Sequence, residues 1–116
     1  MQQRFVILHH QTDAGEHWDL MAEHGDVLLT WSLLREPVGQ LALPLPAKRI
    51  HDHRKRYLDY EGPISGSRGW VRRVESGMVQ IEELTGERCV LALSGEVLSG
   101  RFELRKEGNE WVFDRI

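Results

Sequence analysis

The sequence predicts a small, mainly β protein whose strands form a single antiparallel β-barrel. Short runs of β-branched, aromatic and other apolar residues alternate with turn signals that contain glycine. No long amphipathic helix pattern is present. The turn signals recur at the spacing typical of antiparallel β-structure, at Gly77, Thr85–Gly86, Ser94–Gly95 and Glu107–Asn109. Because closing a sheet removes its exposed edges, we expect a closed or nearly closed barrel.

The first two strands are predicted to form a hairpin. Phe5 to His10 is mostly apolar and β-forming, which favours an extended chain. The segment from Gln11 to Glu16 contains the turn residues Asp13 and Gly15. Extended chain then resumes at His17, so the two strands are expected to lie side by side.

The later part of the chain continues the series of short strands. Alternation of polar and apolar residues is clearest from Arg101 to Arg105, which is typical of a half-buried strand. Further strands are predicted at Val27 to Leu34, Gly69 to Val74, Met78 to Leu84, Arg88 to Leu93, Gly100 to Arg105 and Glu110 to Phe113.

One segment interrupts this pattern. Pro37 to Pro46 contains three prolines and no charged residue. Proline cannot donate to a sheet hydrogen bond, so it disfavours a central strand. We therefore predict an irregular, proline-rich loop that crosses the barrel.

Length and composition indicate one domain spanning residues 1–116. The chain is 41% hydrophobic and 28% charged, which is enough for one core and too little for two ordinary domains. Neither a membrane-length apolar run of about 20 residues nor a signal-peptide pattern is present, so we expect no membrane contact and a cytoplasmic location. Cys89 is the single cysteine and fits a core strand position better than a catalytic one.

Three residues of the predicted hairpin form a candidate metal site. Side chains alternate faces along a strand, so His17, Asp19 and Met21 share one face, and the first strand can place His10 on that face too. Two imidazoles and one carboxylate suit a catalytic divalent metal such as Mn²⁺ or Zn²⁺. The alternative is an ordinary half-buried strand, since a chain with six histidines brings some together by chance.

A basic segment follows the proline-rich loop. Five cationic residues lie between Lys48 and Arg56, although the chain has a formal net charge of −3. Such a segment often forms a solvated face. Here it also includes His51 and His53 and is followed by Tyr57, groups that donate to phosphate oxygens or transfer protons. The sharper hypothesis is therefore phosphate binding.

The four tryptophans divide into two groups. Trp18, Trp31 and Trp111 lie in strand patterns and are predicted to be core residues. Trp70 instead follows a glycine-rich turn that contains Arg68. Two more arginines follow it directly, so stacking on a nucleic-acid base is the alternative to core packing at this position.

Together these motifs resemble the 3′-phosphoesterase domain of bacterial DNA ligase D and its stand-alone relatives, a family that trims 3′ ends during DNA repair. The resemblance covers nearly the whole chain and preserves the order of four motifs. They are the strand Phe5–His10, the strand His17–Met21, the segment Asp52–Tyr57 with Tyr60–Gly62, and Gly95–Phe102.

The resemblance implies roles for individual residues. His10, His17 and Asp19 would ligate manganese, and His53 and Tyr57 would be catalytic residues that contact the substrate phosphate. Three arginines are candidates for binding phosphate or nucleic acid, namely Arg54, Arg56 and Arg68.

This sequence also departs from the family pattern. Met21 occupies the position of the family's active-site arginine, two residues after Asp19. The turn between His10 and His17 is one residue longer than expected. The glycine-rich loop from Pro63 to Gly69 is shortened, which predicts a reduced substrate groove.

Three functional hypotheses follow. The first is a Mn²⁺-dependent 3′-phosphoesterase, with phosphodiesterase or phosphomonoesterase activity on DNA or RNA 3′ ends in DNA repair. The second, which Met21 favours, is a catalytically weakened module that binds nucleic-acid ends and keeps the fold. The third is a metal-free structural barrel, in which His10, His17 and Asp19 would not converge. For the first two we expect nucleic-acid 3′ ends as partners, together with a separately encoded repair ligase or polymerase.

Overall fold

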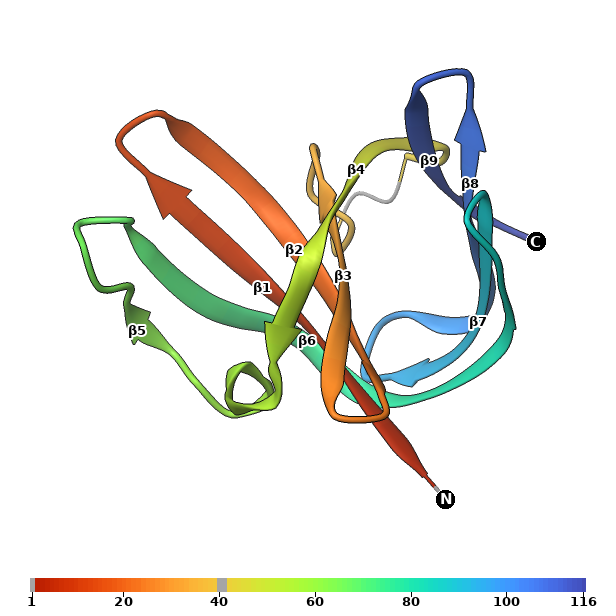
Figure 1. The fold of residues 1–116 in the computed structure, drawn as a ribbon, viewed down its shortest axis with the longest axis horizontal. Helices are drawn as coiled ribbons and strands as arrows, with labels where there is room; N and C mark the ends of the chain where they lie inside the picture. The colour runs from red at the N-terminus through yellow and green to blue at the C-terminus, as the bar shows by residue number, and fades with distance from the viewer. Residues whose placement is uncertain (1, 40–41) are drawn as a thin grey trace.

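The structure, a computed structural model, describes residues 2–39 and 42–116. In this part of the chain it contains nine strands and one short 3₁₀-helix (Figure 1). The strands are β1 (Gln3–Thr12), β2 (Gly15–His24), β3 (Val27–Leu33), β4 (Leu45–Arg54), β5 (Gly62–Pro63), β6 (Trp70–Leu84), β7 (Arg88–Gly95), β8 (Ser99–Glu107) and β9 (Glu110–Arg115). The helix, η1, is Lys55–Leu58.

Eight of these strands form a closed antiparallel barrel, which confirms the predicted fold class. The order around the barrel is β1-β2-β3-β4-β9-β8-β7-β6, and β1 closes it by pairing with β6. The short strand β5 pairs with β6 outside this circuit. Strands β4 and β9, far apart in the sequence, meet where Leu45–Ala47 pairs with Trp111–Phe113.

The barrel interior is the main hydrophobic core. Alternate residues of each strand point inward, which removes their apolar surface from water. Trp18, Trp31 and Trp111 are buried there, as predicted, and the rings of Trp31 and Trp111 meet edge to face. Cys89 also lies in this core. Burial raises the pKa of its thiol to about 11, so it is protonated and unreactive at neutral pH.

A second, smaller apolar cluster lies on the outer face of the barrel. It consists of Val6, Leu8, Met21, Leu28, Leu58 and Val71. These positions alternate with the inward-facing ones, so β1 and β2 bury both faces along part of their length. The chain from η1 to β5 lies beside β1 and β6 in Figure 1 and provides the cover for this outer face.

A buried glutamate fixes the connection between β7 and β8. Glu75 is 4% exposed and accepts hydrogen bonds from the backbone N–H groups of Ser76, Glu96, Val97 and Leu98, at 2.6–3.0 Å. A Cβ atom on Gly95 would lie 2.8 Å from the Glu75 carboxylate, so this position requires glycine. These contacts explain why the Gly95–Phe102 motif begins with glycine.

The structure corrects several predicted boundaries. Gly77 was expected to end a strand, yet β6 runs through it without a break. A side chain there would place its Cβ 2.1 Å from the carbonyl oxygen of Ser94, so Gly77 permits close strand contact instead of forming a turn. The first hairpin is also tighter than expected, because β1 extends to Thr12 and β2 begins at Gly15.

The proline-rich loop was predicted correctly for residues 37–39 and 42–44, whereas residues 40 and 41 lie outside the described residues. Leu45 and Pro46 belong instead to β4, a strand that the basic composition of its second half concealed. Val38 and Leu43 of the loop pack against the barrel core. No helix in the described part of the chain is long and apolar enough to span a membrane.

Candidate active site

The pairing of β1 with β2 brings the predicted metal ligands together. His10 lies directly opposite His17, and Leu8 lies opposite Asp19. Asp19 occupies the outer face of the barrel because its neighbours Trp18 and Leu20 point into the core. His17 lies two residues before Asp19 and His10 lies opposite His17, so both share this face. The local alternation of β2 therefore determines which side chains meet.

The distances within this group are short enough for a shared cation. His10 Nδ1 lies 3.1 Å from His17 Nε2 and 3.8 Å from Asp19 Oδ2, and His17 Nε2 lies 3.3 Å from Asp19 Oδ1. One ligand atom from each residue lies within 4.8 Å of the others. The metal-free hypothesis predicted that these residues would not converge, and that prediction is wrong.

Asp19 is the least satisfied member of the group. It is 3% exposed, and no described group donates a well-formed hydrogen bond to its Oδ1. The nearby Asp19 carboxylate raises the pKa of His17 above its usual value. A buried carboxylate oxygen that lacks a well-formed hydrogen bond is costly unless a cation compensates its charge. The donor set and the unsatisfied oxygen therefore fit a divalent metal.

The orientation of His10 is set by the loop before β6. Its Nε2 lies 2.7 Å from the carbonyl oxygen of Arg68, which can only accept a hydrogen bond. Nε2 therefore carries the proton, and the lone pair of Nδ1 points toward His17 and Asp19. Gly69 keeps the loop against β1, since a Cβ there would lie 2.0 Å from the Gln11 carbonyl oxygen.

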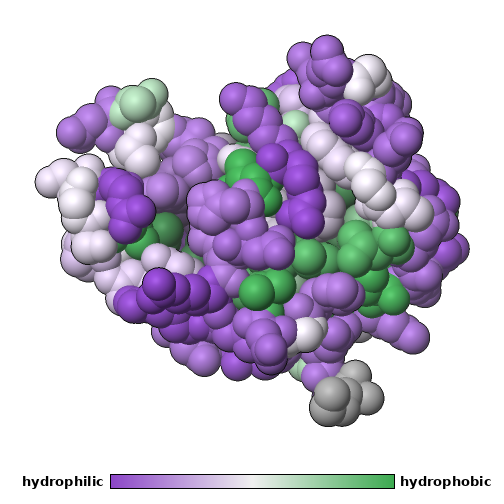
Figure 2. All heavy atoms as spheres, viewed as in Figure 1, coloured by the Kyte–Doolittle hydropathy of each residue, from purple (hydrophilic) through white to green (hydrophobic). Residues whose placement is uncertain are grey.

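The three residues lie in a cavity of about 810 Å³. Its walls come from the outer face of β1 and β2, from β4 and η1, and from the segment around β5. In the space-filling view, the surface between β4 and the β5 end of the molecule is hollowed and largely hydrophilic (Figure 2). The cavity brings together all eight predicted site residues, which are His10, His17, Asp19, His53, Arg54, Arg56, Tyr57 and Arg68.

His53 is held by its own strand. Its Nδ1 donates to the carbonyl oxygen of His51 at 2.9 Å, and the two imidazole rings stack at 4.6 Å. Burial lowers the pKa of His53. At neutral pH its Nε2 therefore carries a lone pair that accepts a proton.

The remaining polar residues differ in how they are held. The Arg56 guanidinium lies over the rings of Tyr57 and Tyr60, at 5.6 and 5.1 Å. Arg68 donates to the backbone and side-chain oxygens of Ser65. Arg54 makes no hydrogen bond or ion pair with a side chain in the described part of the protein, so its guanidinium is available to a ligand.

Comparison with protein families identifies the family to which the chain belongs. The model of the DNA Ligase D 3′-phosphoesterase domain matches residues 8–106 of the 116-residue chain. The chain belongs to this family. A comparison with curated proteins finds no match.

One feature sets this 3′-phosphoesterase domain apart from the expected family pattern. Met21 is 1% exposed and belongs to the outer apolar cluster, with Leu28 and Leu58 among its members. This side of the cavity therefore has an apolar floor where the resemblance led us to expect a guanidinium. The nearby cationic groups are those of Arg54, Arg56 and Arg68, which line the same cavity.

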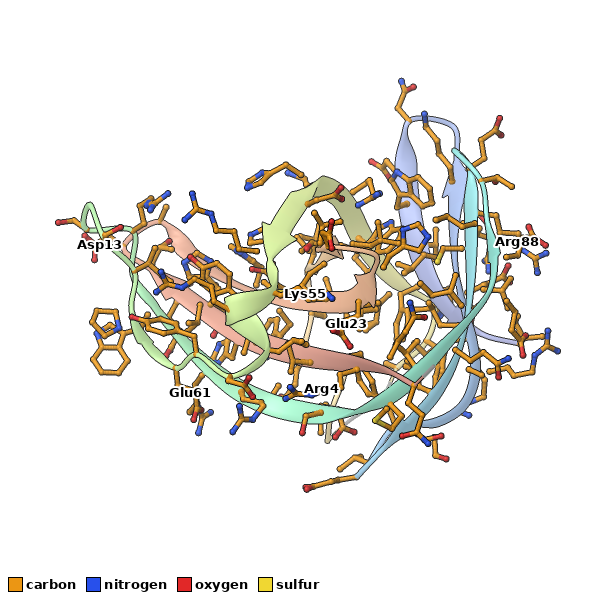
Figure 3. The ribbon with its side chains drawn as sticks, turned by 60° about the horizontal axis from the view of Figure 1, so that its bottom comes forward. Arg4, Asp13, Glu23, Lys55, Glu61 and Arg88 are labelled. Carbon is orange, nitrogen blue, oxygen red and sulfur yellow. The ribbon has the colours of Figure 1, made fainter. Side chains whose placement is uncertain are left out.

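The structure also divides the basic segment into two parts. The Arg49 guanidinium lies 4.4 Å from the centre of the Trp31 ring and pairs with Asp52. Lys55 pairs with Glu23, and Figure 3 labels these two residues. These two cations stabilise the fold. Within the described residues, Lys48, Arg54 and Arg56 have no acidic partner within ion-pair distance.

His51 and Asp52 also line the cavity, although neither was predicted as a site residue. Strict alternation along β4 would turn Asp52 away from His53, yet both line the cavity. Leu28 pairs with His53 and Thr30 with Ile50, so two residues of β4 face a single residue of β3. This β-bulge interrupts the alternation of side chains. The sequence carries no clear signal for it.

Proposed function

We propose that this domain is a Mn²⁺-dependent 3′-phosphoesterase that processes DNA or RNA 3′ ends in DNA repair. One observation carries the proposal. The unsatisfied, buried carboxylate of Asp19 lies beside two imidazoles in a cavity with three arginines, in a chain of the 3′-phosphoesterase family. Cationic groups around a metal suit a phosphate ester.

The ligands would be His10 through Nδ1, His17 through Nε2 and Asp19 through its carboxylate. A mixed nitrogen and oxygen set with open positions suits Mn²⁺. When bound, the ion would polarise a phosphoryl oxygen and lower the pKa of a coordinated water. Arg68 takes part through its carbonyl oxygen, which keeps His10 in the tautomer that offers Nδ1.

Arginines hold the substrate phosphate in this proposal. Arg54 is the leading candidate because no side chain among residues 2–39 and 42–116 bonds to its guanidinium. Arg56 and Arg68 line the same cavity and add positive charge at its walls. Together they supply the charge that Met21 does not, since planar guanidinium groups pair with phosphate oxygens through two hydrogen bonds.

His53 and Tyr57 complete the site. The neutral His53 accepts a proton at Nε2 from the attacking water, and the protonated form can return a proton to the leaving oxygen. From the sequence, His53 was expected to donate to a phosphate oxygen or to transfer a proton, and its tautomer adds the role of base. Tyr57 meets the His53 ring edge to face at 5.7 Å, and its hydroxyl is a donor for a phosphate oxygen.

A second function is favoured by Met21. Removing a positive charge from a phosphoryl-transfer site lowers the rate by orders of magnitude. A domain that keeps the metal and the cavity while reacting slowly would serve as a binding module for nucleic-acid ends. In either case we propose a cytoplasmic protein that works with a separately encoded repair ligase or polymerase.

The two functions differ in phosphate release from an oligonucleotide with a 3′-phosphate. With Mn²⁺, the enzyme hypothesis predicts release by the wild type and a loss of at least about 100-fold in His53→Ala. His24→Ala is the matched control, because His24 is exposed and lies outside the cavity residues. Folded, metal-loaded wild type that binds the oligonucleotide and releases no phosphate would leave the binding module as the function.

A further inference from the structure

Trp70 differs from the other tryptophans in its exposure. Its side chain is 61% exposed, whereas Trp18, Trp31 and Trp111 are at most 9% exposed. A large aromatic ring left in water offers apolar contact area and a flat face to a partner. Trp70 has no role in the proposed catalysis.

The backbone around Trp70 is firmly placed. Trp70 begins β6 and pairs with Gln11 of β1 on one side and with Pro63 of β5 on the other. Gly69, just before it, has a φ of +92° and lies so close to Gln11 that a Cβ would clash with its carbonyl oxygen. A ring presented from a fixed strand binds without first having to be ordered.

Cationic residues lie on both sides of Trp70 in the sequence. Arg72 is two residues further along β6, so it shares the strand face of Trp70. It is exposed and makes no side-chain hydrogen bond or ion pair with other described residues. Arg68 is two residues before Trp70 and lines the cavity. Cationic residues near an exposed aromatic ring are typical of proteins that bind single-stranded nucleic acid.

Arg68 also connects this segment with the metal site. Its carbonyl oxygen accepts the hydrogen bond from His10. Val71, next to Trp70, lines the cavity on the opposite face of β6. Trp70 therefore points away from the cavity, and a strand whose 3′ end lies in the cavity would reach the indole around the loop that contains Arg68. Asp13 and Glu61, labelled in Figure 3, are close in sequence to Gln11 and Pro63 and mark this end of the molecule.

We propose that Trp70, flanked by Arg68 and Arg72, is a stacking platform for an unpaired base of a single-stranded 3′ tail. This inference rests on the proposed function, because the cavity holds the 3′ end of the same strand. Bases within a duplex are already stacked on their neighbours, so only an unpaired base offers its face to the indole. Arg72 would bind a backbone phosphate of that strand.

Binding of a labelled single-stranded oligonucleotide tests the platform. Fluorescence anisotropy without added metal, at low salt, should show that Trp70→Ala weakens binding by about 5- to 150-fold, the range expected for one stacked base. Trp70→Phe, which keeps a ring, should retain most of the affinity. Val97→Ala is the control, because Val97 is 60% exposed and lies in the β7–β8 connection. It should bind like the wild type.

A blunt duplex provides the second comparison. Its affinity should be the same in wild type and Trp70→Ala, because no unpaired base is present. Equal binding of the single strand by both proteins, or an equal loss for strand and duplex, would overturn the platform. Phosphate release by the wild type would then leave the proposed function standing. Binding through Trp70 without phosphate release would overturn the enzyme function and leave the platform intact.

Discussion

Two carboxylates in this protein are almost equally buried and have opposite surroundings. Glu75 is 4% exposed, and four backbone N–H groups donate to it. Asp19 is 3% exposed, and its Oδ1 receives no well-formed hydrogen bond from the described residues. Burial alone therefore does not separate a structural acid from a functional one.

The difference lies in what satisfies each charge. The donors to Glu75 come from the chain itself, so its full stabilisation is present in the folded protein. Asp19 has two imidazoles beside it, which offer lone pairs to the same ligand. A fold retains such an incomplete arrangement when an external cation completes it. The comparison predicts that Glu75 acts on stability and that Asp19 acts on metal binding.

The largest expected effect is the loss of Glu75. Glu75→Ala leaves several buried backbone N–H groups without an acceptor and should lower the free energy of unfolding by about 3–5 kcal/mol. Urea denaturation measures this change. Glu96→Ala, which removes an exposed carboxylate from the same connection, should change it by less than about 0.5 kcal/mol. A small effect in both variants would show that Glu75 does not hold this region.

A smaller effect is expected from the loop that orients His10. Gly69→Ala should displace the Arg68 carbonyl oxygen, because the new Cβ would clash with Gln11. Loss of such an outer contact to a metal ligand weakens metal binding by about 10- to 100-fold. Gly66→Ala is the control: Gly66 also has a positive φ, but its Cβ would meet nothing closer than 3.8 Å. Equal Mn²⁺ affinities in the two variants, measured by calorimetry, would reject this role.

The smallest effect concerns Asp19 in the metal-free protein. Asp19→Asn removes the buried charge while keeping the size of the side chain. The free energy of unfolding in the presence of a chelator should therefore change by less than about 1 kcal/mol. Urea denaturation again supplies the value. A loss as large as that of Glu75→Ala would mean that both carboxylates are structural.

Much of the fold and of the metal site could be predicted from the sequence, because both depend on local patterns. The hairpin that carries His10 and His17 follows from neighbouring strands and a short turn, and the alternation of faces then places Asp19 beside them. The proline-rich loop and the buried tryptophans are also features of single segments. These predictions needed no information about distant parts of the chain.

The remaining features depend on contacts between distant residues. The donors to Glu75 from the β7–β8 connection lie 21–23 residues away, so nothing in its own segment predicts its burial. The bulge in β4 exists only relative to β3, and it changes the direction of Asp52. Gly77 resembles a turn residue until Ser94 lies against it. Each of these features requires the closed barrel.

The most direct test of the account is a titration of the metal-free protein with Mn²⁺, followed by calorimetry for wild type and Asp19→Asn. We expect one Mn²⁺ bound per wild-type chain, with a rise in melting temperature as the ion stabilises the native state. Asp19→Asn should stay folded and lose both the bound Mn²⁺ and the rise in melting temperature. Binding of equal strength and stoichiometry in the two proteins would contradict the claim that Asp19 is held in place for a metal.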